Sequence, residues 1–292
     1  MDERIKDQKI IDLYHEFVHT HFDRRVFLER ATQLLGSTAA ASSALSLLIP
    51  DDASAATVAE DDPRIVTERI AFPGVTGPVK AYLARPKDNA KHGAVEVVHA
   101  IGGISPHIED LARRFAVEGY VAMSVDFLSP AGGTPVPRNP EVAKITQSLK
   151  PEETNANALA GVRYLRSRPE ANGKVGAIGF CWGGGVVNQL AAHDPSLNVA
   201  VPFYGRPPEA ADVPKIKARM LLNYADVTLD TGLGKALPGY EEALKKAGVN
   251  YELHVYQGAN HAFFDDTGAR YNEAAAKLAW TRTLAAFKAT LT

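Results

Sequence analysis

The stretch "GFCWGGG" at residues 179–185 contains Cys181, the single cysteine of this 292-residue chain. An apolar run, Lys174–Ile178, precedes it and a helical pattern begins at Gly184, so the cysteine falls where a strand turns into a helix. In the form G-x-C-x-G, small residues two positions away let a sharp turn hold the side chain above a sheet. The N–H groups that begin the helix favour a thiolate. The motif predicts a nucleophile; a packing cysteine in a glycine-rich turn is the alternative.

An acid and a base follow in the order that such a nucleophile needs. The segment "RMLLNYADVTLD" ends a predicted strand in a loop with Asp226 and Asp230, and "YELHVYQGANHAFFDD" ends the last strand in a loop with His261. Both loops fall at carboxyl ends of strands, where open α/β sheets bind ligands. His261 would take the thiol proton, and the aspartate would fix the tautomer of the imidazole. Counting back from Pro238, where we expect the next helix to begin, favours Asp230 over Asp226.

Backbone N–H groups supply the remaining chemistry. We expect those of Trp182, directly after the cysteine, and of Ile101, in the loop after the third strand, to stabilise a developing oxyanion. The side chains of Tyr204 and Trp182 are candidates to line a substrate pocket, although aromatic residues beside a sheet also serve as packing.

These residues require an alternating α/β framework to position them. A hairpin is predicted at 66–72 and 79–84, because "PGVTGP" separates two strand-like runs. Further strands are expected at 94–100, 120–125, 174–178, 198–204, 218–224 and 251–256, and helices at 106–118, 152–167, 184–193, 238–247 and 271–291. Short apolar strands alternating with helices predict an α/β fold with a mostly parallel sheet and helices on both faces.

Composition narrows the possible partners. The chain is 46% hydrophobic with a formal net charge of −2, which argues against a nucleic-acid footprint and against attraction to an anionic membrane. A lone cysteine forms no internal disulfide. No phosphate-binding loop is present, and we expect neither a cofactor nor a metal.

The first 56 residues differ from the rest and predict an export leader, which leaves residues 57–292 as the catalytic domain. Arg24 and Arg25 precede an uncharged run over residues 31–49, and "DASAAT" at 52–57 offers a small-residue cleavage site. These parts resemble a twin-arginine signal and predict a periplasmic or secreted protein without stable membrane insertion after cleavage. The run is also about long enough to span a bilayer, so a retained anchor or cytoplasmic residence is the alternative.

The leader also contains "HEFVH" at residues 15–19, which matches the zinc pattern H-E-x-x-H. A zinc centre needs a buried, pre-organised site and usually a third protein ligand. We therefore interpret this segment as part of an amphipathic leader helix.

The chain resembles the dienelactone hydrolase family of the α/β-hydrolase fold, in particular an exported branch with a twin-arginine leader. The specific marks are "PHIEDLARRFAVEGYVAMSVDFLSPAGGT", "GFCWGGG", "VPFYGRPP" and "GANHAFFDDTGARYNEAAAKLAWTRT". The resemblance implies a carboxymethylenebutenolidase-type hydrolase of small lactones or esters that works through a thioester. Carried over by motif, the triad is Cys181, Asp230 and His261.

Two positions depart from the family pattern. Ala100 stands where members carry a glutamate that holds or triggers the thiol, and Glu96 lies too far back along its strand to replace it. Asp265 stands where some members have a substrate-binding arginine. Arg206 in "FYGRPP" is our candidate anchor for a substrate carboxylate, since a guanidinium grips a carboxylate with two hydrogen bonds, and a surface salt bridge is the alternative. The missing glutamate keeps two other functions open: a hydrolase of peptides or thioesters, and a non-catalytic binding protein.

Overall fold

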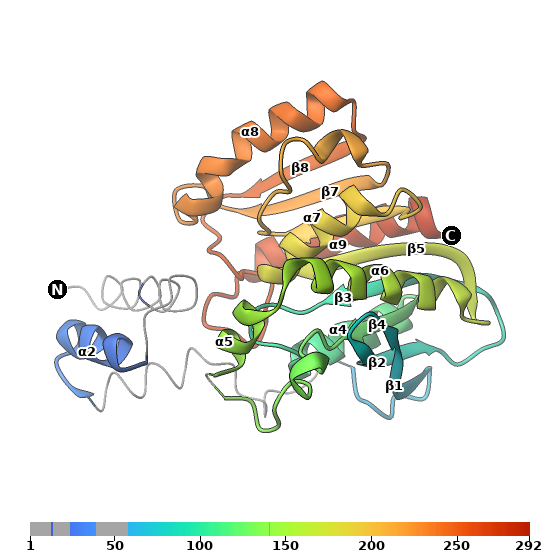
Figure 1. Cartoon of the computed structure of the whole chain (residues 1–292), viewed down its shortest axis with the longest axis horizontal. Coiled ribbons are helices and arrows are strands. Elements are labelled where there is room, and N and C mark those ends of the chain that lie inside the picture. Colours follow the sequence, from blue (N-terminus) through green and yellow to red (C-terminus); the bar gives the residue numbers. More distant parts are fainter. Residues whose placement is uncertain (1–12, 14–23, 39–57, 140) are drawn as a thin grey trace. The chain divides into compact units, whose positions relative to one another are not determined.

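The computed structural model describes Leu13 and residues 24–38, 58–139 and 141–292 (Figure 1). The chain divides into two units, Met1–Ser54 with Thr267–Ala269, and Ala55–Asp266 with Arg270–Thr292. In the first unit, helix α2 (Arg24–Leu35) begins at the arginine pair. The H-E-x-x-H segment and the expected cleavage region lie outside the described residues. Among the helices that are described, none combines the length and the apolar character that crossing a membrane demands.

The second unit is built on an eight-stranded sheet in the order β1-β2-β4-β3-β5-β6-β7-β8. The two pairings of β2, with β1 and with β4, are antiparallel, and every later pairing is parallel. The strands are β1 (Ile65–Gly74), β2 (Gly77–Pro86), β3 (His92–Val98), β4 (Val121–Val125), β5 (Ala171–Phe180), β6 (Val199–Phe203), β7 (Arg219–Ala225) and β8 (Tyr251–Tyr256).

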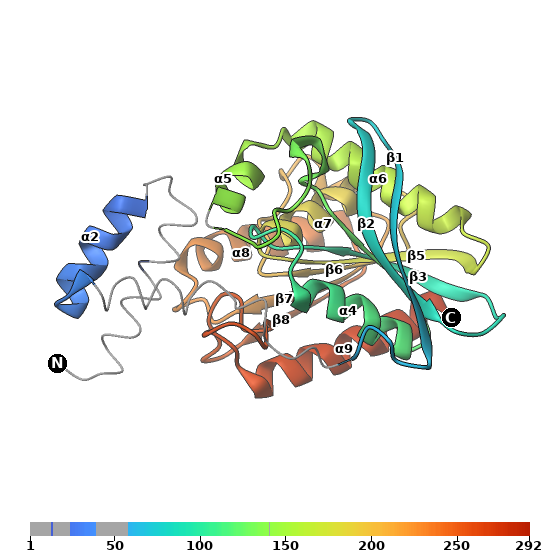
Figure 2. The ribbon, with the colours of Figure 1, turned by 90° about the horizontal axis from the view of Figure 1, so that it is seen from below.

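Helices cover both faces of this sheet. Figure 2 shows α6 and α7 on one side and α4 and α9 on the other. The helices are α4 (Pro106–Val117), α5 (Glu141–Ser148), α6 (Pro151–Ser167), α7 (Trp182–His193), α8 (Thr231–Ala247) and α9 (Glu273–Leu291), with short 3₁₀ turns at Ser129–Ala131 and Val213–Lys215. The predicted α/β class, with a mostly parallel sheet between helices, is confirmed.

Each face of the sheet buries its own apolar core, as the alternation along β3 shows. Ala94 and Val98 pack in the core that contains residues of α6 and α7, whereas Val95 and Val97 pack in the core that contains residues of α4 and α9. Because both faces are buried, the strand reads as a nearly continuous apolar run. Glu96 interrupts that run and is fully buried.

The prediction that a helix begins at Pro238 is wrong. Helix α8 begins at Thr231, and Pro238 lies inside it. A proline within a helix costs about 3 kcal/mol. Leu237, Tyr240 and Leu244 are buried along one face of this helix, and each buried side chain of this size returns about 1.5–3 kcal/mol. The free energy gained by burying these side chains therefore exceeds the cost of Pro238 inside the helix.

Helix α5 has no counterpart among the predicted elements. It has only eight residues, of which Val142 and Thr146 are buried. Two buried positions one turn apart give too short a periodic pattern to distinguish a helix from a surface loop.

Candidate active site

Cys181 occupies a strained turn between β5 and α7. It is the N-cap residue of α7, with φ 56° and ψ −115°, a conformation that side-chain-bearing residues rarely adopt. Its N–H donates to the carbonyl of Phe203 at 3.0 Å, and its carbonyl accepts from the N–H of Gly185 at 3.1 Å. Such a conformation costs on the order of 1–3 kcal/mol and persists only where the surroundings impose it. The predicted strand-to-helix bend is therefore present at the cysteine.

Two glycines permit this bend. A Cβ at Gly179 would clash with the carbonyl of Gly183, and a Cβ at Gly183 would clash with the carbonyl oxygens of Val98 and His99. Helix α7 can therefore begin directly against the end of β3 only because both positions lack a side chain. This close approach brings Cys181 beside the loop that follows β3.

Asp230 and His261 are brought together from two other loops at the same edge of the sheet. His261 Nδ1 donates to Asp230 Oδ2 at 2.6 Å, and both residues are buried. Asp230 is the N-cap residue of α8, yet its side chain makes no capping hydrogen bond. Its carboxylate is directed at the imidazole instead, so it fixes the Nδ1–H tautomer.

The electrostatics of His261 connect it to Cys181. Burial disfavours the imidazolium, but the negative charge of Cys181 and the hydrogen bonds with Asp230 and Cys181 outweigh it, and the pKa of His261 rises to about 9. The electrostatic contribution of Cys181 shows that its side chain lies close to the imidazole.

Asp226, the alternative acid, has other partners. Its Oδ1 accepts from the N–H of Thr228 at 2.9 Å and from the Thr228 hydroxyl at 2.7 Å, and its Oδ2 accepts from the N–H of Gly258 at 2.8 Å. The hydrogen bonds from Gly258 and Thr228 lower the pKa of this carboxyl. Asp226 thus ties together the loops that carry Asp230 and His261.

Tyr204 packs against the imidazole. Its ring centroid lies 4.7 Å from that of His261, and the residue is almost fully buried. Burial, together with the charges of Asp265 and Cys181, raises the pKa of Tyr204 well above its ordinary value, so the phenol stays neutral. Cys181, Tyr204 and Ala262 are the non-glycine residues of the described chain with positive φ, and each follows a strand or His261 at this edge. Backbone strain is thus concentrated around the cysteine and histidine.

The loop after β3 forms a tight turn. The N–H of Gly103 donates to the carbonyl of Ala100 at 3.1 Å. The hydroxyl of Thr146, on α5, donates to the carbonyl of Ile101 at 2.9 Å, and Arg138 Nε donates to the carbonyl of Gly102 at 3.0 Å. This loop is held by its carbonyl groups, and no carboxylate stands at Ala100.

Sequence reasoning missed His99. It directly follows β3, is fully buried, and stacks on the indole of Trp182 with ring centroids 5.4 Å apart. The signal was available, because a polar residue directly after a buried apolar strand is what drew attention to Asp226.

Arg206, the predicted carboxylate anchor, has an exposed side chain. Its backbone carbonyl accepts from Asn188 Nδ2 at 3.0 Å, while the described contacts do not connect its guanidinium to Cys181 or His261. Its role stays a prediction.

Glu96 lies deep in the sheet, where no described residue hydrogen-bonds its carboxyl oxygens. They pack against Gly161 of α6, where even an added Cβ would not fit. Burial, reinforced by the charge of Asp194, raises the pKa of Glu96 well above its ordinary value. It is therefore a neutral acid in the core rather than a substitute for the glutamate absent at Ala100.

One group of side chains offers metal-type ligands: His107, Asp265 and Asp266 present atoms within 4.8 Å of one another. However, Asp266 accepts from His107 Nδ1 at 2.8 Å and pairs with the Arg114 guanidinium at 2.5 Å. A guanidinium on the same carboxylate disfavours a cation there. The group acts as a salt-bridge network that ties the loop after His261 to α4.

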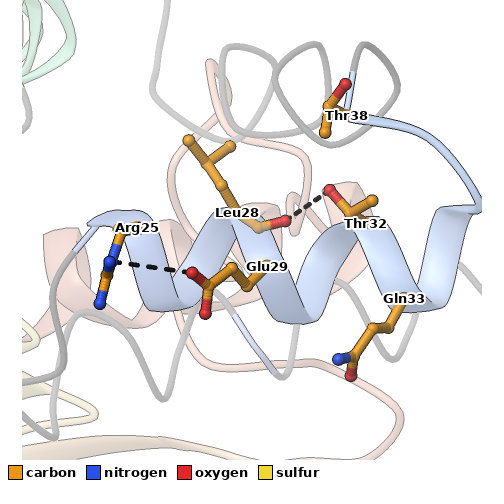
Figure 3. Close-up of a pocket in the computed structure, with 6 residues that line it drawn as sticks. All are labelled: Arg25, Leu28, Glu29, Thr32, Gln33 and Thr38. Carbon is orange, nitrogen blue, oxygen red and sulfur yellow. Dashed lines mark hydrogen bonds and ion pairs between the residues drawn. The ribbon is translucent and has the colours of Figure 1, made fainter.

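A separate hollow lies on the first unit beside α2 (Figure 3). Six residues line it: Arg25, Leu28, Glu29, Thr32, Gln33 and Thr38. Their contacts are those of a helix surface, with Arg25 and Glu29 paired at 3.7 Å and the Thr32 hydroxyl donating to the carbonyl of Leu28 at 2.6 Å. The described contacts therefore give this hollow no paired nucleophile and base of the kind seen at Cys181 and His261.

Comparison with known proteins assigns the part of the chain that contains this site to a protein family. Residues 79–291, which include every side chain of the Cys181 site, match the model of the dienelactone hydrolase family. The chain belongs to the dienelactone hydrolase family. It is therefore a member of a family of hydrolases of the carboxymethylenebutenolidase type, and its sheet is that of the α/β-hydrolase fold.

Relatives and solved structures agree with the family. An Escherichia coli O157:H7 protein called "Putative carboxymethylenebutenolidase" is 31% identical over 274 residues, which cover 88% of this chain and 96% of the relative. A Synechocystis protein of the same name is 33% identical, covering 78% and 98%. The crystal structure of a "Putative Dienelactone Hydrolase" from Klebsiella pneumoniae superposes with a TM-score of 0.69 at 28% identity, covering 77% and 98%.

Proposed function

We propose that this protein hydrolyses small lactones or esters with Cys181 as nucleophile, His261 as general base and acid, and Asp230 as the group that orients the imidazole. The observation that carries the proposal is the convergence of a cysteine in a strained turn with an imidazole held by a carboxylate at 2.6 Å. A cysteine that served only as packing would need none of this arrangement.

The reaction proceeds in two halves. The Cys181 sulfur attacks the carbonyl carbon, the C–O bond of the ester or lactone breaks, and imidazolium His261 gives its proton to the leaving oxygen. In the second half, His261 takes a proton from water, the resulting hydroxide attacks the thioester carbonyl, and the Cys181 thiolate leaves. One water is consumed, a hydroxyl and a carboxylic acid are formed, and the acid releases its proton to solvent as the carboxylate.

The oxyanion of each tetrahedral intermediate is stabilised by backbone N–H groups. The N–H of Trp182 is at the start of α7, where no carbonyl of the helix is available to it, and that of Ile101 belongs to the turn after β3. A donor of this kind contributes about 10²–10³ in kcat.

The names of the relatives support the proposed substrate class. The names of the matched proteins specify carboxymethylenebutenolidase, and one 32% identical protein from Bradyrhizobium, matched over 218 residues, is named for a lactonase activity. A carboxylate-bearing lactone would use Arg206 as its anchor, because its side chain is exposed and its backbone and Cβ lie beside Gly185 in the first turn of α7.

The experiment combines turnover with a trapped intermediate. The protein is mixed with an activated ester, quenched in acid and analysed by mass spectrometry, while a panel of lactones with and without carboxylates is assayed in parallel. We expect an acyl adduct on Cys181 and loss of both adduct and turnover in Cys181→Ala. Unchanged turnover in Cys181→Ala would contradict the proposal.

We further propose that Arg24 and Arg25 belong to a twin-arginine export signal, so that the hydrolase acts outside the cytoplasm. The pair is followed by the uncharged run of the leader and begins α2. Replacing both arginines by lysine keeps the charge and should abolish export of the folded protein, measured by fractionation. Replacing Arg30 by lysine is the matched control, and export of the Arg24→Lys/Arg25→Lys variant at the normal level would refute this point.

A further inference from the structure

His99 lies between the two predicted oxyanion donors. It directly precedes the turn that contains Ile101, and its ring is stacked on Trp182 at an interplanar angle of 13°. Phe127 contacts both of these rings edge-on, with its centroid 5.7 Å from that of His99 at 72° and 5.7 Å from that of Trp182 at 73°. A third contact is made by the backbone, because the His99 carbonyl oxygen faces Gly183 of α7, where a Cβ would not fit. The imidazole is therefore held in one orientation.

Both ring nitrogens of His99 have partners, and these define its protonation. The N–H of Phe127 lies 3.2 Å from Nε2. Because a backbone N–H only donates, Nε2 is the acceptor and the proton of the neutral ring is on Nδ1. Nδ1 lies 2.7 Å from the carbonyl oxygen of Ala100 and therefore donates to it.

This hydrogen bond fixes the peptide that carries the Ile101 N–H. The Ala100 carbonyl accepts twice, from His99 Nδ1 and from the N–H of Gly103. The Ala100–Ile101 peptide bond is trans, so its C=O and N–H groups point in opposite directions. With the carbonyl held on the side of the imidazole, the N–H of Ile101 is directed to the other side.

We infer that His99 is a positioning residue for hydrolysis: it aims the Ile101 N–H at the oxyanion and, by stacking on Trp182, keeps the second donor in register with the first. The inference rests on the proposed function. Both ring nitrogens of His99 are engaged, by the Ala100 carbonyl and the N–H of Phe127, so it acts through the Ala100–Ile101 peptide and through the start of α7.

The neutral state of the ring suits this role. Burial lowers the pKa of His99, and the nearby Arg138 guanidinium acts in the same direction, while the Ala100 carbonyl and Asp126 oppose them. An imidazolium would lose the lone pair that accepts from Phe127. His99 is thus built as a fixed donor rather than as a second base.

The test separates oxyanion stabilisation from reactivity of the sulfur. His99→Phe keeps a flat ring on Trp182 but loses both hydrogen bonds, and should lower kcat by about 10–100-fold with little change in KM, since a full oxyanion donor contributes about 10²–10³. Affinity for a trifluoromethyl ketone, which forms an oxyanion adduct, should fall by a similar factor. Alkylation of Cys181 by iodoacetamide needs the thiolate but no oxyanion hole, and its rate should stay within about 2-fold.

His99→Gln is the rescue variant, because its amide can donate to the Ala100 carbonyl while its carbonyl accepts from Phe127. It should retain kcat within about 5-fold of the parent. His254→Phe, the same change at a half-buried histidine on β8, is the matched control and should leave kcat unchanged.

The inference is overturned if His99→Phe keeps the parental kcat, if alkylation falls as much as kcat, or if His99→Gln is folded and as slow as His99→Phe. A failure of the proposed function is distinct from these outcomes. In that case the parent protein itself forms no acyl adduct on Cys181.

Discussion

Two buried carboxyl groups of this protein have opposite surroundings. Asp230 lies at the carboxyl edge of the sheet, where His261 donates to it at 2.6 Å. Glu96 lies in the middle of β3, packed against Gly161, with no hydrogen-bond partner among the described residues. Both are removed from water, yet the first is arranged to be ionised and the second is held neutral, because its pKa is raised well above the ordinary value.

The comparison shows that burial alone does not make a functional group. A buried carboxylate is tolerated when a cationic or hydrogen-bonding partner replaces the lost water, and the loops at the edge of the sheet supply that partner. In the middle of the sheet, no described residue supplies such a partner to Glu96. An ionised carboxylate such as Asp230 is therefore stabilised at the carboxyl edge of the sheet, whereas ionisation of Glu96 in the middle of the sheet would lower the free energy of unfolding.

The largest effect is expected from Asp230→Asn. The amide cannot hold the Nδ1–H tautomer or stabilise the imidazolium, so kcat should fall by about 10³–10⁴-fold, as in hydrolases that lose the orienting carboxylate. Initial rates with an activated ester measure the change.

Asp226→Asn is the matched control, since Asp226 is also a buried loop aspartate but braces Thr228 and Gly258. Its main effect should be a loss of about 1–3 kcal/mol in stability. If Asp226→Asn lowered kcat as much as Asp230→Asn, the contrast between the two aspartates would be wrong.

A second effect is expected in the pH dependence of stability. The pKa of Glu96 is raised in the folded state, so the folded protein binds one more proton than the unfolded chain above the unfolded pKa. The free energy of unfolding should then decrease by about 1.4 kcal/mol per pH unit, from roughly pH 4.5 up to the folded pKa. Glu96→Gln stays neutral and should remove this slope, measured by urea unfolding between pH 4.5 and 8.

The control for this prediction is Glu152→Gln, the same change at an exposed position of α6. It should leave the pH slope as in the parent. A slope that is identical in the parent and in Glu96→Gln would show that Glu96 is ionised in the folded protein.

The smallest effect is a shift in a pH profile. The pKa of His261 is about 9 because the charge of Cys181 and the hydrogen bonds with Asp230 and Cys181 outweigh burial. Since the imidazolium must protonate the leaving oxygen, kcat/KM should fall as the pH rises through about 9. In Asp230→Asn the fall of kcat/KM at alkaline pH should shift to a lower pH, because the hydrogen bond with Asp230 no longer raises the pKa of His261. A fall at the same pH in both proteins would contradict that assignment.

The sequence was sufficient for the parts of the molecule that short-range patterns determine. The apolar runs gave the strands of the parallel sheet, and the order of Cys181, the aspartates and His261 indicated which loops meet. Asp230 was preferred by counting back from Pro238, a helix start that proved wrong, although Asp230 is the aspartate that contacts His261. The order of loops is thus more informative than the count of residues within one.

Long-range packing explains what the sequence did not predict. The buried face of α8 overrides its proline, and α5 owes its formation to Val142 and Thr146, which pack away from solvent. The orientation of the His99 ring depends on contacts with Phe127 and Trp182, which lie 28 and 83 residues further along the chain. Glu96 stood out in the sequence, but its contact with Gly161 depends on the helix that crosses the sheet there.

The lack of a side chain at Gly183 limits where this fold can accept substitutions near Cys181. Any side chain at that position would push α7 away from the end of β3 and carry the sulfur with it. Substitutions that broaden or narrow the range of accepted molecules are therefore confined to the surrounding loops, such as the one with exposed Val227 and Leu229. In the proposed mechanism, the Cys181 sulfur keeps its place while the loops around it are free to vary.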